Sequence, residues 1–279
     1  MKIKDILLFL TSYPTPTHRR AVEDAVALAE GLGAQIRAIA FEVDVQSPLG
    51  LYVDSAGVSG ILAADRCAHD ASDLLEHFEK VVTARGVAHD HSPLVCRLHQ
   101  IPERLVAEAQ FCDLAIVPLR PMETVERDIA EGLIFGCGRP VLVFPQDLKR
   151  DLPTSLKNVA LAWDNSRPAT RAIADALPFL QQAKEVRVFT VVGDNSVHAL
   201  RSLAKLAKHL ARHGVEIVSE DVKCNGRAIG GVFSAYVFEH KIDLLVMGAY
   251  GHSRFREFIL GGATESMLDR PPSWILLSH

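Results

Sequence analysis

Three glycines near the C-terminus have a spacing that suits phosphate binding. The pattern is G-x2-G-x9-G, and with the residues directly after it the segment contains Gly248, Gly251, Gly261, Gly262, Ala263 and Thr264. Because glycine tolerates positive φ and carries no Cβ, backbone N–H groups in such a loop can approach phosphate oxygens closely. Ser253 and Thr264 would add hydroxyl donors, and Arg254 would add positive charge. We interpret the pattern as an anion-binding loop, and the alternative is a set of turn and packing glycines.

The loop needs a rigid support, and short apolar runs predict one built from parallel strands. The runs are residues 6–11, 35–43, 92–98, 114–119, 141–144, 159–164, 186–192, 216–222, 244–247 and 274–277. Most are rich in Val, Ile and Leu without strict alternation, which is typical of parallel strands covered on both faces. Helical patterns separate them, at residues 19–31, 63–85, 169–182 and 197–213. This alternation predicts a doubly wound α/β fold, with the glycine loop at the carboxyl edge of a sheet.

The order of elements occurs twice in the 279 residues, which predicts two similar domains. The run at residue 6 matches the run at residue 159, and Asp113 with its following run matches Asp243. The offset between the halves therefore shortens from 153 to 130 residues, so the first half has 23 more residues, which we place mainly in the stretch 44–65. A polar, proline-containing stretch at 145–158 is typical of a linker. We predict domains at residues 1–146 and 157–279.

The C-terminal part of the chain resembles the universal stress proteins. The likeness runs through residues 246–254, which read Val-Met-Gly-Ala-Tyr-Gly-His-Ser-Arg, and through Gly261 to Thr264. Nucleotide-binding members of that family carry G-x2-G-x9-G followed by Ser or Thr. The present chain has Gly262 at the Ser/Thr position, and Thr264 is the nearest hydroxyl. The strand and helix order of both halves fits, so the resemblance covers the chain as a tandem pair.

The resemblance implies a five-stranded parallel sheet in each half and an adenine nucleotide between the first and fourth strands. It places Asp164 near adenine and ribose, although a capping role ahead of Ser166 and Pro168 is the alternative. The backbone of Val191 would contact adenine. The implied binding residues are Ala162, Trp163, Asp164, Val191, Met247, Gly248, Gly251, His252, Ser253, Arg254, Gly261, Gly262, Ala263 and Thr264.

The first half departs from this pattern. The segment after its fourth apolar run reads Pro-Leu-Arg-Pro-Met at residues 118–122 and contains no glycine. Proline removes backbone donors and restricts φ, so this loop cannot wrap a phosphate in the same way. Its first run ends in Thr11 and Ser12 with no Asp. We predict a degenerate nucleotide site in this half, which would serve packing or partner binding.

Composition and missing motifs exclude several function classes. A formal net charge of −4 gives no basic excess for nucleic acid or an anionic membrane, and no apolar run is long enough to span a bilayer. The five cysteines include no C-x-x-C pair, which favours reduced thiols in a cytoplasm. Walker, dinucleotide and H-E-x-x-H motifs are absent, as is a nucleophile elbow, so we expect no native metal site and name no catalytic residue.

We therefore expect a cytoplasmic stress-response protein that binds ATP, ADP or AMP in its C-terminal half, with little or no hydrolysis. Mg²⁺ would accompany the nucleotide without a dedicated carboxylate set. The alternatives are an interaction or scaffold protein that binds no nucleotide, and a weak ATPase. The apolar run at 274–277 would leave an open sheet edge, so we expect the halves to pair there, with a homodimer left open.

Overall fold

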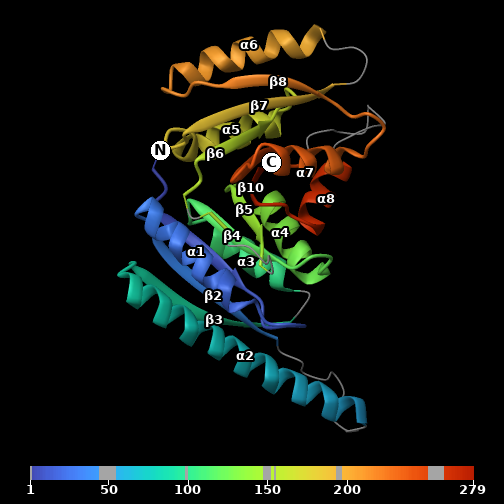
Figure 1. Ribbon diagram of the computed structural model, residues 1–279. Coiled ribbons are helices and arrows are strands. Elements are labelled where there is room, and N and C mark those ends of the chain that lie inside the picture. Colours follow the sequence, from blue (N-terminus) through green and yellow to red (C-terminus); the bar gives the residue numbers. More distant parts are fainter. Residues whose placement is uncertain are drawn as a thin grey trace.

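Apolar strands that are buried on both faces form the centre of the structure. The structure is a computed structural model, and it describes residues 2–43, 55–97, 100–146, 152–153, 155–192, 197–250 and 261–279. The strands form one ten-stranded sheet in the order β3-β2-β1-β4-β5-β10-β9-β6-β7-β8 (Figure 1). The strands are β1 Asp5–Leu10, β2 Gln35–Val43, β3 His89–Cys96, β4 Leu114–Leu119, β5 Val141–Pro145, β6 Asn158–Ala162, β7 Glu185–Val192, β8 Val218–Lys223, β9 Leu244–Gly248 and β10 Trp274–Ser278. The predicted doubly wound α/β class is confirmed.

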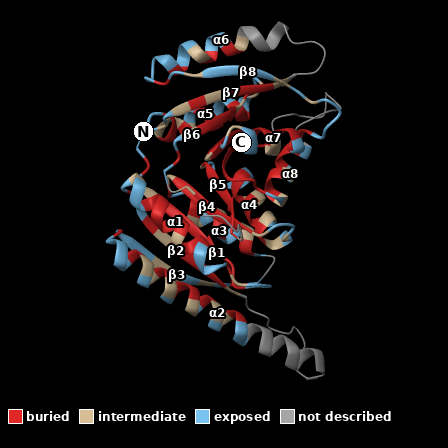
Figure 2. Ribbon diagram, viewed as in Figure 1, coloured by how far each residue is buried: buried red, intermediate tan, exposed pale blue. Residues whose placement is uncertain are grey.

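Helices cover both faces of this sheet. They are α1 Arg19–Leu32, α2 Ser55–Arg85, α3 Ile101–Ala109, α4 Thr124–Gly136, α5 Arg167–Leu180, α6 Val197–Ala211, α7 Ile229–Glu239 and α8 Gly261–Asp269. Buried residues of α1, α2, α5 and α6 pack into one core against one face, and those of α3, α4, α7 and α8 form a second core on the other. In Figure 2 the buried residues concentrate on the central strands. Among the described helices, none is long and apolar enough to cross a membrane.

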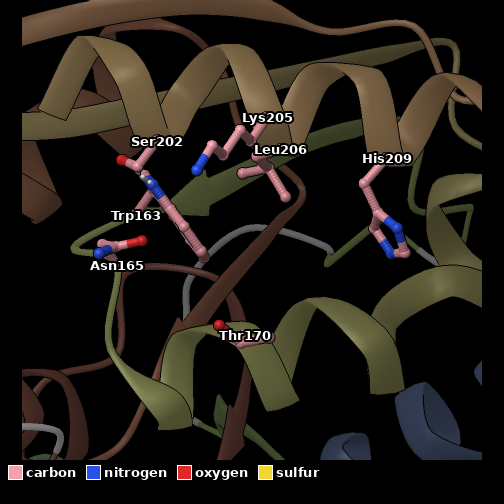
Figure 3. A pocket seen from close by; sticks show the side chains of 7 residues that line it. All are labelled: Trp163, Asn165, Thr170, Ser202, Lys205, Leu206 and His209. Atoms are coloured by element: carbon pink, nitrogen blue, oxygen red, sulfur yellow. Dashed lines mark hydrogen bonds between the residues drawn. The ribbon is translucent and has the colours of Figure 1, made fainter.

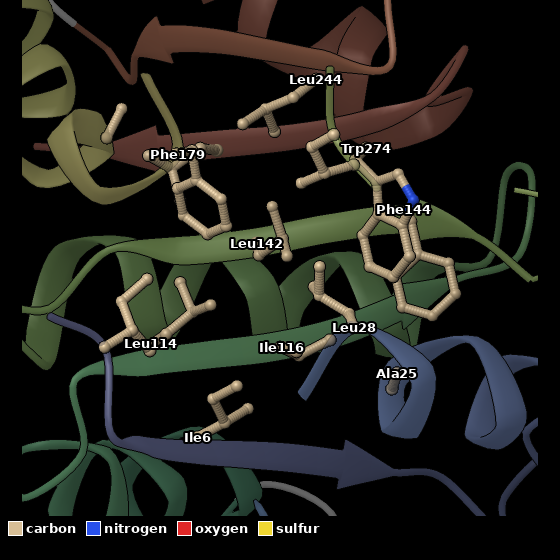
Figure 4. Packing of buried hydrophobic residues seen from close by; sticks show 14 of the residues in the cluster. Ile6, Ala25, Leu28, Leu114, Ile116, Leu142, Phe144, Phe179, Leu244 and Trp274 are labelled. Atoms are coloured by element: carbon tan, nitrogen blue, oxygen red, sulfur yellow. The ribbon is translucent and has the colours of Figure 1, made fainter. Parts of the chain in front are cut away.

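The two halves meet through their last strands. β5 and β10 pair antiparallel, with Leu142 opposite Leu276, whereas every other strand pair in the sheet is parallel. The rings of Phe144 and Trp274 lie 4.1 Å apart at this junction (Figure 4). Trp274 Nε1 donates to the carbonyl oxygen of Pro153 at 3.1 Å, which fastens the linker to the sheet. We expected the halves to pair at residues 274–277, and β10 pairs with β5 there, so the two five-stranded sheets form one continuous sheet.

Element boundaries deviate from the sequence predictions at the outer strands. β3 begins at His89, three residues before the predicted run, and β8 begins at Val218, two residues after it. Both strands lie at the edges of the sheet and carry exposed side chains, so their apolar pattern is weak. The extra residues of the first half, 44–65, are described only from Ser55, where they form the start of α2.

Candidate functional site

The carboxyl ends of β6 and β9 form the rim where the sequence places its binding residues. The two strands are parallel neighbours, and Ala162 lies opposite Met247 in their register. The helices that follow them leave on opposite sides, since α5 packs into the core that contains α1 and α8 packs into the core that contains α4. Such a divergence is the topological switch point at which open α/β sheets bind ligands.

Four of the predicted residues lie on the α7 and α8 side of this rim. Ala162 and Val191 are partly buried against the same core that contains Met247 and Ala263. Met247 and Ala263 are themselves almost completely buried. Their side chains therefore support the rim, and only backbone atoms of these two residues are suited to contact a ligand there.

Trp163 lies on the opposite face. Its side chain packs into the core beneath α5 and α6, and its Nε1 donates to Ser202 Oγ at 3.0 Å. The side-chain direction alternates along a strand, so the residue after Ala162 must face away from it. The structure thus separates Trp163 from the other predicted binding side chains.

Asp164 lies in the turn ahead of the N-cap of α5, as the alternative interpretation of the sequence allowed. Its Oδ1 accepts a hydrogen bond from the backbone N–H of Ser166 at 3.0 Å. Ser166 is the N-cap of α5, and its hydroxyl accepts from the backbone N–H of Ala169 at 3.1 Å. Asn165 between them has a φ of +61°, a conformation that Asn adopts more readily than most residues. This turn holds the Asp164 carboxylate at the end of β6.

Gly248 is required by packing. A Cβ at this position would lie 2.4 Å from the backbone nitrogen of Ala169 and 2.6 Å from the carbonyl carbon of Pro168. The end of β9 therefore touches the backbone of the first turn of α5. The packing role that the sequence allowed for the glycines holds for this one, and it also draws the N-terminus of α5 over the rim.

At the start of α8 the hydroxyl of Thr264 is buried, whereas Gly262 is exposed. Thr264 is fully buried, and its Oγ1 accepts from the backbone N–H of Tyr250 at 3.3 Å. The hydroxyl thus fixes the beginning of the glycine loop. Gly262 is exposed, and a Cβ there would meet no atom of the described part of the chain within 4 Å. Gly261 is the first residue of α8, and Gly251, His252, Ser253 and Arg254 lie outside the described residues.

Residues 155–277 match the model of the Universal stress protein family. The C-terminal half of the chain is therefore a universal stress protein domain. Among solved structures, a universal stress protein from Archaeoglobus fulgidus is similar over 98% of this chain and 95% of its own, with a TM-score of 0.69 and 16% identity. A functionally unknown protein from Pseudomonas aeruginosa is similar over 99% of this chain and 92% of its own, with a TM-score of 0.58 and 15% identity. At these identities the likeness shows the fold, here across both halves. No curated protein matches the sequence.

The corresponding rim of the first half, between the ends of β1 and β4, is filled by a buried carboxylate. Glu126 of α4 is 1% exposed, and its Oε1 accepts from Gln146 Nε2 at 2.6 Å and from Thr11 Oγ1 at 3.3 Å. Its Oε2 accepts from the backbone N–H of Arg120, whose guanidinium lies 3.6 Å from Oε1. Burial raises the pKa of Glu126 above the ordinary value of a glutamate. No spacing in the sequence indicated this residue, because its partners come from three separate loops.

Tyr250 ties the glycine loop of the universal stress protein domain to the first half. Its backbone adopts a φ of +51°, and its hydroxyl donates to Glu131 Oε1 of α4 at 2.8 Å. Its ring lies 4.8 Å from that of Phe135. Burial raises the pKa of the Tyr250 hydroxyl, so it stays a donor at neutral pH. No pattern in the sequence indicated this contact, although Tyr250 stands inside the motif.

Within the described residues, no group of three or more His, Cys, Asp or Glu side chains could hold a metal ion. Asp164 is the carboxylate that the sequence placed at the C-terminal rim, and one of its oxygens is engaged in the cap.

Proposed function

We propose that the C-terminal half binds ATP or a related adenine nucleotide, ADP or AMP, at the rim between β6 and β9, with little or no hydrolysis. The observation that carries the proposal is the divergence of α5 and α8 at the ends of two neighbouring parallel strands. A rim of this kind is open to a ligand and presents backbone donors to it. A stress-response role in the cytoplasm would follow from the family, and the five free cysteines are consistent with a reducing compartment.

The first turn of α8 supports phosphate binding. Backbone N–H groups at a helix N-terminus have no intrahelical partner and carry partial positive charge. Gly261 begins the helix, and a Cβ added at Gly262 would meet no atom of the described residues within 4 Å. Phosphate oxygens could therefore approach these amides without steric hindrance from the residues that the structure describes. The glycine loop before α8 would supply further amides.

Hydrolysis is disfavoured because a general base is missing from the described part of the rim. Asp164 is partly occupied with the backbone of Ser166, and Thr264 is buried. Phosphoryl transfer needs a positioned nucleophile and charge stabilisation beyond backbone amides. We expect phosphate release from ATP to be no faster with the wild type than with Asp164→Ala. A clearly faster wild-type rate would favour the weak ATPase instead.

Calorimetric titration with ATP and Mg²⁺ tests the binding proposal. The Gly251→Val variant places a branched side chain in the loop, and Gly231→Val is the matched control on an exposed turn of α7 with open space around it. We expect saturable binding to the wild type and to Gly231→Val, and affinity at least about tenfold lower for Gly251→Val. Circular dichroism of each variant verifies the fold.

Negligible heats from the wild type would contradict nucleotide binding. The protein would then be better described as an interaction or scaffold protein, for which the replacement of the family hydroxyl by Gly262 is the supporting feature. Mass spectrometry of small molecules that co-purify with untreated protein would identify which nucleotide is resident.

A further inference from the structure

A groove opens between α5 and α6 on the face of the sheet opposite to α7 and α8. It has a volume of about 510 Å³, which lies within the range of small-molecule sites. Figure 3 shows side chains from both helices and from the end of β6 pointing into it. Its lining residues are Trp163, Asn165, Thr170, Ser202, Lys205, Leu206 and His209.

The equivalent seam in the first half is closed by larger apolar side chains on α2. The sequences of α2 and α6 align without a gap when the residues that follow the two helices, Gly86-Val87 and Gly214-Val215, are matched. In this alignment Leu74, Phe78 and Val81 correspond to Ser202, Leu206 and His209. Leu74 and Phe78 are almost fully buried, and α2 packs closely on α1. The second half has replaced this packing with smaller or polar side chains.

The facing helix shows the same replacement. We align α1 with α5 by their N-caps, His18 and Ser166. In this alignment Val22 corresponds to Thr170. Val22 is fully buried beneath α2, whereas Thr170 is exposed to the groove. Compared with α1 and α2, both α5 and α6 therefore have smaller or polar side chains at the positions that face each other. The groove between α5 and α6 results from these two sets of differences together.

The lining combines an apolar wall with positive charge. The indole of Trp163 forms the wall and is held by the hydrogen bond from its Nε1 to Ser202 Oγ. Lys205 makes no ion pair within the described part of the chain, and no acidic residue is among those that line the groove. An indole face favours a flat aromatic ring, and an ammonium group favours an anion.

We propose that this groove is a second ligand site, which takes a small aromatic carboxylate. The aromatic ring would lie against Trp163 and Leu206, and the carboxylate would accept a hydrogen bond from Lys205 Nζ. Trp163 and the side chains of Ala162 and Val191 lie on opposite faces of the sheet, so this site is separate from the proposed nucleotide rim. The proposal does not depend on nucleotide binding.

The indole N–H signals of protein labelled with ¹⁵N-tryptophan provide a direct test. The chain has two tryptophans, and Trp274 is completely buried at the β5–β10 junction. We expect 2-naphthoate to shift the Trp163 signal saturably and to leave the Trp274 signal in place. The neutral amide, 2-naphthamide, should bind about fivefold or more weakly because it lacks the charge that Lys205 recognises.

Two variants and one control make the test specific. Lys205→Ala should weaken 2-naphthoate by about fivefold, while Lys208→Ala, an exposed position on the same helix outside the lining, should leave it unchanged. Leu206→Phe puts the residue of the first half into the groove and should abolish the shift while the Trp274 signal verifies the fold. No saturable shift of Trp163, equal effects at Lys205 and Lys208, or undiminished binding by Leu206→Phe would overturn the proposal.

Discussion

The close approach of β9 to α5 predicts that Gly248→Ala destabilises the protein without any ligand present. The added Cβ would lie 2.4, 2.6 and 2.9 Å from three backbone atoms of Pro168 and Ala169. Backbone atoms cannot rotate away, so the strand and helix must separate by about 1 Å to reach ordinary van der Waals distance. Overpacking of this kind costs about 2–3 kcal/mol, a large part of the stability of a typical domain.

Urea unfolding monitored by circular dichroism measures this cost, and Gly262→Ala is the matched control. Gly262 lies in α8 with open space around it, so alanine there should leave the stability unchanged or raise it by about 0.5–1 kcal/mol. The reasoning fails if Gly248→Ala is as stable as the wild type. It also fails if the two variants lose the same free energy, because then glycine would be needed for a reason other than the contact with α5.

Four further predictions concern polar contacts and open space. Glu126→Ala should cost about 2–4 kcal/mol in urea unfolding, because it leaves Gln146 and the Arg120 amide without their acceptor. Burial raises the pKa of Glu126, so the protonated form is favoured in the folded state. The free energy of unfolding of the wild type, relative to that of Glu126→Gln, should be greatest below pH about 4.3 and should fall as the pH rises through the elevated pKa. A relative free energy of unfolding that rises with pH would contradict this. Tyr250→Phe should cost about 1 kcal/mol through loss of the hydrogen bond to Glu131, whereas an unchanged midpoint would mean that the contact is not stabilising. Gly262→Ser restores the hydroxyl typical of nucleotide-binding relatives where there is room for it, and should strengthen ATP binding about fivefold by calorimetry; weaker binding would show that this position does not face the phosphates.

The central strands could be predicted from the sequence because their burial on both faces produces continuous apolar runs. Residues 6–11 and 159–164 were predicted as strands, and β1 and β6 occupy Asp5–Leu10 and Asn158–Ala162. The edge strands β3 and β8 were placed less accurately, since one or both of their faces meet solvent and the pattern weakens. Predictions from apolar runs are therefore most accurate for strands in the middle of the sheet.

The site was less predictable than the fold. Glycine spacing located the rim, because a loop after a parallel strand must lie at the carboxyl edge. It could not show that the Trp163 side chain packs beneath α6, because the face of the sheet that α6 covers is set only in the folded chain. Glu126 was missed for a different reason: a buried carboxylate is stabilised by partners from distant loops, here Thr11 and Gln146, and their approach exists only in the folded chain.

The antiparallel pairing of β5 with β10 has a consequence for communication within the molecule. Because all other neighbouring strands are parallel, the strands of the two halves run in opposite directions, and their carboxyl ends emerge at opposite edges of the sheet. A molecule seated at one edge cannot touch the other. Helix α4 contacts the second half at two places between these edges, since Arg127 donates to Asp269 at the end of α8 and Glu131 accepts from Tyr250 in the segment after β9.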